Sequence, residues 1–488
     1  MPVETITVQQ AYRFALDPTP RQGRAFASHA GAARFAYNWG IARVGQALDE
    51  RTEQRAAGAQ PTTKVPGHFD LCKLWTAHKN NPANGLGWVA QNFVGTYQAA
   101  LRDAAGAWKV FFDSRTGRRK GRPMGRPRFK KKGRSRDSFQ VHGTTLQVTD
   151  SRHVKLPKIG EVRVHEPTRK LRRRLANGTA RLVRGTVTRG AHRWYISLTV
   201  EIQREIRTAP SARQRAGGTV GVDLGVKHLA TLSTGEHIAN PRHLAAATRR
   251  LAAAQRALSR TAKGSNRRRR AAARVARIHT QVTNLRTNAT NQLTSRLVHQ
   301  HAVIAVEDLN VAGMTRSARG TIDNPGRNVR QKAGLNRAIL DGAFATIRWQ
   351  LDHKTRWYGS RLAVIGRFEP SSKTCSACGT AKTTLPLAER TFTCESCGLV
   401  IDRDHNAARN IAVWADEQDV GSGDVAPSAE ETQNARGGLV SPAVPRGRGR
   451  SPAKREARSR PSVGVRRAAP PGNRRASSPN PESTPRPA

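Results

Sequence analysis

Two CxxC pairs in the C-terminal half constrain the fold of this chain more than any other feature of its sequence. Cys375 and Cys378 form the first pair, Cys394 and Cys397 form the second, and fifteen residues separate the two pairs. Pairs at this distance can direct four thiolates to one ion, as in a zinc ribbon. A glycine directly follows each pair and suits a tight turn. We therefore expect a zinc site within 369–400, which is structural because four thiolates fill the coordination shell.

The cysteines also indicate a reducing compartment. Five cysteines in 488 residues are too few for a disulfide framework, and thiolates held on zinc agree with a cytoplasmic, nucleoid-associated protein. The fifth cysteine, Cys72, lies in the apolar stretch LCKLW and is expected to pack in a core. The first residues, MPVETITVQQAYRF, show no basic segment followed by an apolar run, so we expect no secretion signal.

The charge balance predicts a polyanionic partner. The chain carries 85 Lys and Arg residues against 34 Asp and Glu residues, for a net charge of +51. Such an excess opposes compaction through self-repulsion unless a polyanion neutralises it, and nucleic acid fits this requirement best. A membrane is not expected as a partner, because no stretch approaches the roughly 20 apolar residues that a membrane-spanning helix needs.

The N-terminal part, residues 1–216, shows alternating helical and strand-like periodicity. We expect a strand at 3–16, helices at about 21–48 and 92–112, and a small β-rich module at 138–204.

A basic arm, residues 115–136, interrupts this N-terminal part. It contains twelve Lys or Arg residues and no acid, and its glycines and prolines prevent a helix. We expect it to lie extended along a phosphate backbone, with a solvated linker as the alternative. The residues expected to contact nucleic acid are Arg118, Arg119, Lys120, Lys130, Lys131 and Lys132.

A second domain is expected to open near residue 217. Residues 237–306 contain fourteen Lys or Arg residues and no Asp or Glu. A helical hairpin is predicted over 241–300, because leucines recur every seven residues in its first half and a Lys-Gly-Ser-Asn turn precedes its second half. A helical surface without acids is typical of phosphate binding, and the residues expected there are Arg267, Arg268, Arg269 and Arg270.

Three acidic residues lie at the ends of short apolar elements. Asp223 follows the strand-like run at 219–222, Glu307 follows the run at 303–306, and Asp404 stands at the start of a predicted helix. Carboxylates at the C-terminal ends of strands converge on one edge of a sheet, and a helix N-terminus facing that edge can bring a third. Three such groups can hold two Mg²⁺ ions about 4 Å apart for phosphodiester hydrolysis.

Each of these acids also has an ordinary explanation. The GVDLG run around Asp223 is similar to the phosphate-gripping turn of an actin-like ATPase, although we find no second phosphate loop. Glu307 could pair with an arginine, and Asp404 could cap its helix. Asp308 should point to the other side of its strand, whereas Asp402 is an open alternative to Asp404.

The last part of the chain, residues 416–488, is rich in Pro, Ser, Gly, Ala and Arg. Its apolar content is too low to offset the loss of chain entropy, so we expect a disordered basic tail.

Taken together, three motifs resemble the TnpB/OrfB proteins of bacterial insertion sequences. These are GVDLGVK, VEDLNV, and a CxxC…CxxC ribbon that runs directly into DRDHNAARNI. Members of this family are RNA-guided DNA endonucleases with a RuvC-like nuclease domain, and they are considered ancestral to the type V CRISPR effectors. The strong resemblance covers about 217–414, while the order of elements in 1–216 is similar to the family's wedge and recognition lobes.

The resemblance implies an α/β chain, α+β overall, with an RNase H-like RuvC domain. This domain would occupy 217–368 and 401–415, carry the zinc ribbon 369–400 as an insertion, and follow a β-rich wedge and a helical recognition lobe within 1–216.

The resemblance also implies roles for the three acids. Asp223, Glu307 and Asp404 match the metal-binding acids of the RuvC site, where they would hold Mg²⁺. Asp404 is preferred to Asp402 because the family's third acid stands two residues before the asparagine of its motif, here Asn406. All three acids are present, so the resemblance implies an active nuclease.

The implied activity is guided cleavage of double-stranded DNA. The chain would hold a guide RNA transcribed from its own element, read a short motif beside the target, and leave the remaining recognition to base pairing. Water activated by Mg²⁺ would attack phosphorus without a covalent enzyme intermediate. Neither the guide sequence nor the oligomeric state can be read from the sequence.

Two other functions remain open on the residues alone. A DNA transposase or recombinase could join strands with the same three acids, because hydrolysis and strand transfer both use activated hydroxyl groups and paired metals. A non-catalytic zinc-ribbon protein that binds nucleic acid would account for the charge and the cysteines without any catalysis.

Overall fold

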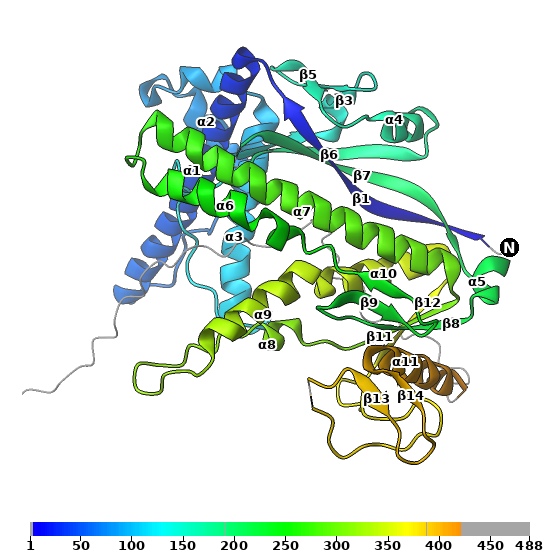
Figure 1. Cartoon of the computed structure of the whole chain (residues 1–488). Coiled ribbons are helices and arrows are strands. Elements are labelled where there is room, and N and C mark those ends of the chain that lie inside the picture. Colours follow the sequence, from blue (N-terminus) through cyan, green and yellow to red (C-terminus); the bar gives the residue numbers. More distant parts are fainter. Residues whose placement is uncertain (1–2, 191, 387, 421–488) are drawn as a thin grey trace, which may run out of the picture. The chain divides into compact units, whose positions relative to one another are not determined.

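The computed structural model describes residues 3–190, 192–386 and 388–420 (Figure 1). The chain has the mixed α/β composition expected from its sequence, with a seven-stranded sheet, a five-stranded sheet and a small two-stranded sheet. Of the predicted tail 416–488, the first five residues extend helix α11 (Arg403–Val420), and the remainder lies outside the described residues. In the part of the chain that is described, no helix is both long and apolar enough to cross a bilayer.

The seven-stranded sheet has the order β2-β6-β7-β1-β5-β4-β3. Strand β1 (Val3–Asp17) runs antiparallel along nearly the whole of β7 (Trp194–Arg207), and alternate residues of β7 from Trp194 to Ile202 are buried. The sequence predicts β1 and the β-rich module separately, and the structure joins them in one sheet. The other strands are β2 (Ser138–His142), β3 (Gln147–Val148), β4 (His153–Leu156), β5 (Gly160–Val164) and β6 (Ala180–Arg189).

Helices α1 (Pro20–Ala56) and α3 (Val94–Arg115) pack together beside this sheet. Thr19 starts α1 with a capping box, in which its hydroxyl accepts a hydrogen bond from the Gln22 amide and the Gln22 side chain accepts from the Thr19 amide. Helix α1 is longer than predicted, and α2 (His68–Asn80) was not predicted at all. The short helices of this part are α4 (Arg169–Ala176) and α5 (Ala212–Ala216), with single 3-10 turns at Pro82–Asn84, Gly87–Gln91 and Gly143–Thr145.

The five-stranded sheet has the order β10-β9-β8-β11-β12. Three neighbouring strands run parallel, namely β8 (Thr219–Asp223), β11 (Val303–Glu307) and β12 (Arg361–Ile365). All three therefore end at the same edge of the sheet. Strands β9 (His228–Leu232) and β10 (His237–Ala239) continue the sheet in antiparallel pairing.

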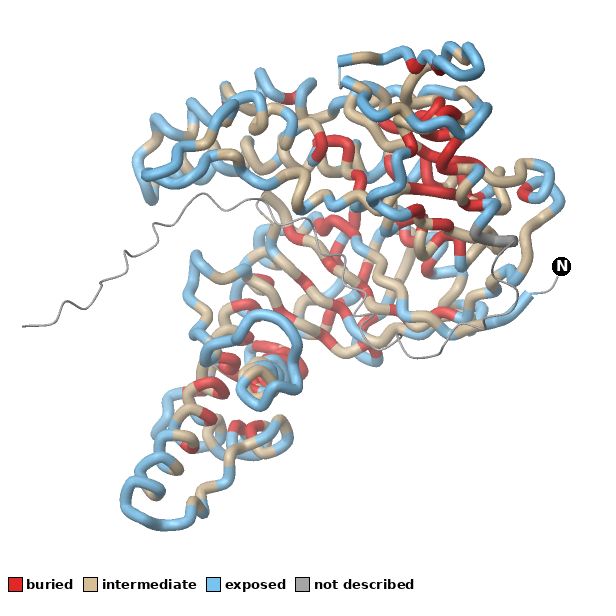
Figure 2. Tube along the Cα trace, turned by 90° about the horizontal axis from the view of Figure 1, so that it is seen from below, coloured by how far each residue is buried: buried red, intermediate tan, exposed pale blue. Residues whose placement is uncertain are grey.

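Helices cover both faces of this sheet. On one face, Ile304 and Val306 of β11 pack with residues of α7 (Asn266–Gln300), α9 (Val329–Gly342) and α10 (Phe344–Tyr358). On the other face, Ala305 packs with α11. The alternation along β11 therefore separates two cores, as expected for a strand that is buried on both sides. Figure 2 shows the buried residues gathered in the interior of the chain and the exposed residues along its outer helices and turns.

The predicted helical hairpin is confirmed as α6 (His243–Ser259) and α7, joined by a turn in which Ser265 caps α7. Ala247 and Ala254 are the buried residues of α6. Helix α7 packs on α6 and also on α10. Two small elements complete this half, helix α8 (Val311–Met314) and the hairpin of β13 (Thr391–Thr393) and β14 (Val400–Asp402).

Candidate active site and metal centre

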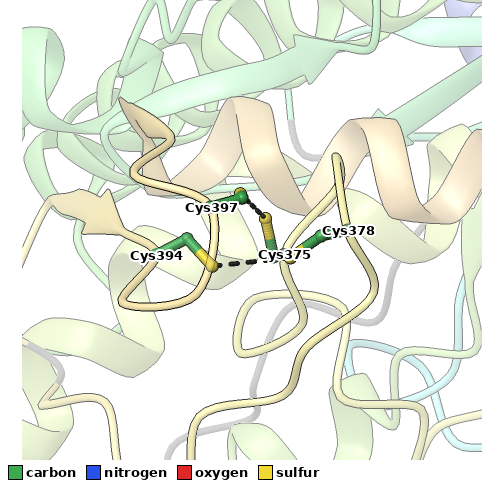
Figure 3. Close-up of side chains that lie close together, drawn as sticks. All are labelled: Cys375, Cys378, Cys394 and Cys397. Atoms are coloured by element: carbon green, nitrogen blue, oxygen red, sulfur yellow. Dashed lines mark hydrogen bonds between the residues drawn. The ribbon is translucent and has the colours of Figure 1, made fainter.

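The four cysteines of the CxxC pairs meet at one point (Figure 3). Their sulfur atoms all lie within 4.8 Å of one another, and the Cys375–Cys397 and Cys378–Cys394 Sγ–Sγ distances are both 3.6 Å. A disulfide would bring two sulfurs to about 2.05 Å. Four sulfurs at about 2.3 Å from a tetrahedral zinc ion lie about 3.8 Å apart, so this donor set fits zinc.

Two glycine turns shape the cysteine cluster. Gly379 and Gly398 have φ angles of +76° and +70°, and their amides donate to the carbonyls of Cys375 and Cys394. Only glycine adopts this left-handed conformation without strain, which explains the glycine after each pair. Phe392 of β13 is fully buried against the cluster and supplies its small apolar core.

Asp223 and Glu307 are side by side at one edge of the five-stranded sheet. Each is the last residue of its strand, and the parallel register places Val222 of β8 opposite Val306 of β11. The sequence prediction that strand ends bring these two acids together is therefore confirmed at the level of the backbone.

Asp404 reaches the same edge because α11 packs directly on β8. The contact requires a glycine in the strand: a Cβ atom on Gly221 would collide with the carbonyl oxygen of Ala408 and lie 2.7 Å from the Ala412 amide nitrogen. Asp404 is the acid in the first turn of α11, where the positive end of the helix dipole favours a carboxylate.

The structure distinguishes Asp404 from its neighbour Asp402. The Asp402 carboxylate accepts hydrogen bonds from the amides of Asp404 and His405, at 3.0 and 3.1 Å, so Asp402 caps α11. The Asp404 carboxylate lies 4.0 Å from the Arg390 guanidinium. The capping role that the sequence left open for Asp404 thus belongs to Asp402. Asp308, next to Glu307, pairs instead with Arg367 at 2.6 Å.

The charge of Asp223 is disfavoured by its surroundings. The pKa of Asp223 is raised to about 8, mainly because the carboxyl group is removed from water. The charges of Glu307 and Asp404 contribute to a smaller extent. Among the described residues, only the four cysteines bring three or more ligand atoms within 4.8 Å of one another, so the carboxylates form a wider group than the thiolates. Hard carboxylate oxygens around an acid whose charge is disfavoured by burial and by its neighbours fit a divalent cation such as Mg²⁺.

A polar network that the sequence did not predict ties Glu307 to the cysteine segment. The Ser371 hydroxyl donates to Glu307 Oε1 at 2.6 Å, and Asn410 of α11 donates to the carbonyls of Ser371 and Thr374 at 2.7 and 2.6 Å. Asn406 donates to Thr374 O and accepts from the Ser376 amide. Asn406 and Asn410 are almost completely buried, so they fix the start of the cysteine segment on the helix that carries Asp404. A polar residue on the core-facing side of an amphipathic helix is the sequence signal that could have identified them.

The basic residues expected to contact nucleic acid lie on two surfaces. Residues 116–137, after α3, form no helix, as predicted for the arm, and they include several turns and bends. One arm residue differs from the rest, since the Lys130 ammonium lies 3.7 Å from the centroid of the Tyr37 ring and its amide donates to Asn38. In the hairpin turn, Arg268 donates to the carbonyls of Leu258 and Thr261. The exposed members are Arg118, Arg119, Lys120, Lys131, Lys132, Arg267, Arg269 and Arg270.

Three family models match the chain. Residues 197–318 match a model described as a probable transposase, OrfB of the IS605 type, and residues 344–411 match the Cas12f1-like TNB domain. Residues 5–59 match a helix-turn-helix domain of the same OrfB type. In the structure this last segment is strand β1 followed by one continuous helix, α1.

Relatives that match more than four fifths of the chain carry the same kind of name. A protein of Mycobacterium tuberculosis H37Rv is 35% identical over 84% of this chain and 87% of its own length. The InsQ protein of Escherichia coli K12 is 34% identical over 82% of this chain and 91% of its own length. Both are named as provisionally assigned RNA-guided DNA endonucleases. A Cas12f1 chain solved by cryo-EM with sgRNA and target DNA aligns over 83% of this chain and 99% of its own length, with a TM-score of 0.47 and 12% identity.

Proposed function

Because the chain belongs to the TnpB/OrfB family of the IS605 type, we propose that it is an RNA-guided DNA endonuclease with one RuvC-like active site. The juxtaposition of Asp223, Glu307 and Asp404 carries this proposal. Two parallel strands end side by side, and a helix packed on one of them adds the third acid at its first turn. The motifs that resemble the family in sequence are the segments that form this edge of the sheet.

The three carboxylates would hold the catalytic Mg²⁺. Metal bound there would supply an activated water and stabilise the leaving oxygen of the phosphodiester. The residues of the chain have separate tasks in this arrangement. Ser371 orients the Glu307 carboxylate, Asp402 fixes the first turn of α11, and Gly221 allows that helix to approach β8.

The zinc ribbon would stabilise the acidic site without supplying a catalytic group. Four thiolates would bind one Zn²⁺, and the ordered ribbon would then present Ser371 to Glu307 through the carbonyl contacts of Asn406 and Asn410. The ion would be structural, because the four protein ligands leave no position for water.

Guide RNA and double-stranded DNA are the proposed partners. The names of the relatives point to both, and the net charge of +51 requires a large polyanion. The basic arm, residues 115–136, and the turn of the α6–α7 hairpin would contact phosphates of these nucleic acids.

The identity of the RNA that copurifies with the chain tests this proposal directly. We would purify the full chain from cells that carry its native flanking DNA, wash it at high salt, and sequence the RNA that stays bound, because nonspecific phosphate contacts weaken steeply with salt. One discrete RNA that ends in sequence from outside the element supports the proposal. Heterogeneous RNA, or none, contradicts it.

A transposase activity is the second candidate, because the matched OrfB model is described as a probable transposase. The same acids could direct a DNA 3′ hydroxyl, rather than water, to the phosphorus atom. Incubation of the protein with labelled element ends distinguishes the two: joined strands favour transposition, whereas cut and unjoined strands favour the endonuclease.

A further inference from the structure

Three ring side chains form a row along the outer side of helix α10. Trp349, His353 and Trp357 are four residues apart, and their ring centroids are separated by 4.5 Å and 4.7 Å along the row. The row continues onto the seven-stranded sheet, because the Arg204 guanidinium of β7 lies 3.8 Å from the centroid of the Trp357 ring. We call these four residues the aromatic row.

Core packing accounts for only part of the aromatic row, because His353 and Trp357 are half-buried whereas Trp349 is exposed. Helix α10 buries its opposite side, where Ile347 and Leu351 contact the five-stranded sheet. Trp349 is 56% exposed, so the row ends in an indole ring that is open to a stacking partner.

An open cavity of about 520 Å³ adjoins the Trp357 end of the row. Two further rings line it, His299 of α7 and Tyr358 of α10, with centroids 4.4 Å apart. Its charged groups are the guanidinium groups of Arg204 and Arg207 and one carboxylate, that of Glu205.

An exposed indole ring at one end of the row, with half-buried rings and guanidinium groups at the other end, is a combination suited to unpaired nucleobases. Bases stack on aromatic side chains and on arginine planes, while arginine also forms bidentate hydrogen bonds to phosphate. A double helix cannot use such a surface, because its ring faces are already stacked on one another. Such a surface therefore suits a nucleic acid strand with unstacked bases.

The position of the cavity indicates which strand this is. Tyr358 lies just before β12, and its backbone bridges to Arg207 of β7. The cavity is thus at the edge where the parallel strands begin, while Asp223 and Glu307 are at the edge where they end. Five strand residues, about 16 Å, separate the two edges. Bases held in the cavity are therefore not at the carboxylates, and this position suits a strand that stays bound and is not cut.

We propose that the aromatic row and the adjoining cavity bind unpaired bases of the guide RNA. This inference rests on the proposed function, since it names the partner of a second surface of the same RNA-guided enzyme.

The test compares variants that keep an aromatic ring with variants that keep only an apolar side chain. We would measure binding of the copurified RNA to the zinc-loaded full chain at raised salt, for Trp349→Leu and Trp357→Leu and for the matched Trp349→Phe and Trp357→Phe. Phe69→Leu, at an exposed ring on α2, is the control for a nonspecific aromatic effect. Thermal unfolding and zinc content identify any variant that fails to fold. Ultraviolet crosslinking with mass spectrometry of the unmodified protein then identifies the nucleotides in contact with Trp349 or Trp357.

We expect each Leu variant to bind RNA at least about fivefold more weakly, because fivefold is the lower end of the effect of losing one base–aromatic stack. Each Phe variant should bind RNA about as well as the unmodified protein. Equal RNA binding by all variants, with strong binding by the unmodified protein, overturns the inference and leaves the proposed function intact. Weaker binding of single-stranded DNA without any effect on RNA also overturns it. Absence of RNA binding by the unmodified protein overturns both.

Discussion

The Ser371 hydroxyl donates a 2.6 Å hydrogen bond to the Glu307 carboxylate, although the two residues are 64 positions apart in the chain. Ser371 precedes the first cysteine pair, and Asn410 of α11 holds its carbonyl oxygen. The cysteine segment, the helix that carries Asp404 and the strand that carries Glu307 therefore share one hydrogen-bonded network. This relationship gives the zinc ribbon a role at the acidic site without making it a catalytic element.

Ser371→Ala should weaken metal-dependent DNA cleavage by about tenfold, because a hydrogen bond to a charged group contributes about 1.5–3 kcal/mol. We expect weaker Mn²⁺ binding by calorimetry and unchanged zinc content. Ser396→Ala, at an exposed serine of the second cysteine pair, is the control and should behave as the unmodified protein. Equal Mn²⁺ affinity in all three proteins would show that Ser371 does not position Glu307.

Substitution of Asp402 should affect stability, whereas substitution of Asp404 should affect catalysis. Asp402→Ala removes the cap of α11 and should lower the free energy of unfolding by about 1 kcal/mol while guided cleavage continues. Asp404→Ala should abolish cleavage with little change in unfolding. Denaturant unfolding and a cleavage assay on both variants check this, and the reverse assignment of the two effects would refute the proposed role of Asp404.

The approach of α11 to β8 depends on Gly221. Gly221→Ala places a methyl group against the backbone of Ala408 and Ala412, so the free energy of unfolding should fall by about 1–3 kcal/mol or more, and cleavage should be lost. Gly106→Ala is the matched control, because this exposed glycine of α3 has no atom within 4 Å of the added methyl group. That variant should gain about 0.5–1 kcal/mol. A stable, active Gly221→Ala protein would mean that α11 does not need this contact.

The buried Lys354 should make the free energy of unfolding depend on pH. Burial lowers the pKa of this lysine from 10.5 to about 8, and its ammonium donates to Thr294 Oγ1 and Ser295 Oγ at 2.7 and 2.9 Å. Since the folded pKa lies below the unfolded pKa, the unfolded chain binds more protons between these values. The contribution of Lys354 to the free energy of unfolding should therefore rise as the pH increases from about 8 to 10.5.

Lys354→Met should remove this part of the pH dependence. Denaturant unfolding at several pH values checks the slope, and Lys263→Met, at an exposed lysine of the α6–α7 turn, should keep it. Parallel pH profiles for the unmodified protein and Lys354→Met would contradict the prediction.

Local patterns explain which parts of the fold could be predicted. The cysteine site follows from spacing, because each pair and its glycine act within a few residues. The α6–α7 hairpin follows from periodicity and from a turn that ends in the capping residue Ser265. Asp223 and Glu307 could be placed together because parallel strands end at a common edge.

Contacts between distant segments could not be predicted. The pairing of β1 with β7 joins residues about two hundred positions apart, and no local pattern specifies it. The Ser371–Glu307 bond and the burial of Asn410 exist only after α11 has packed on the sheet. Choosing Asp404 over Asp402 needed either the family resemblance or the capping geometry.

Guide-programmed cleavage tests the central claim most directly. The purified protein with its bound RNA would be mixed with plasmids that differ only in whether they match the guide, in the presence of Mg²⁺. We predict cleavage of the matched plasmid alone, and none by Asp223→Asn with the same RNA bound. Cleavage that ignores the match, or that persists in Asp223→Asn, would contradict an RNA-guided endonuclease built on these carboxylates.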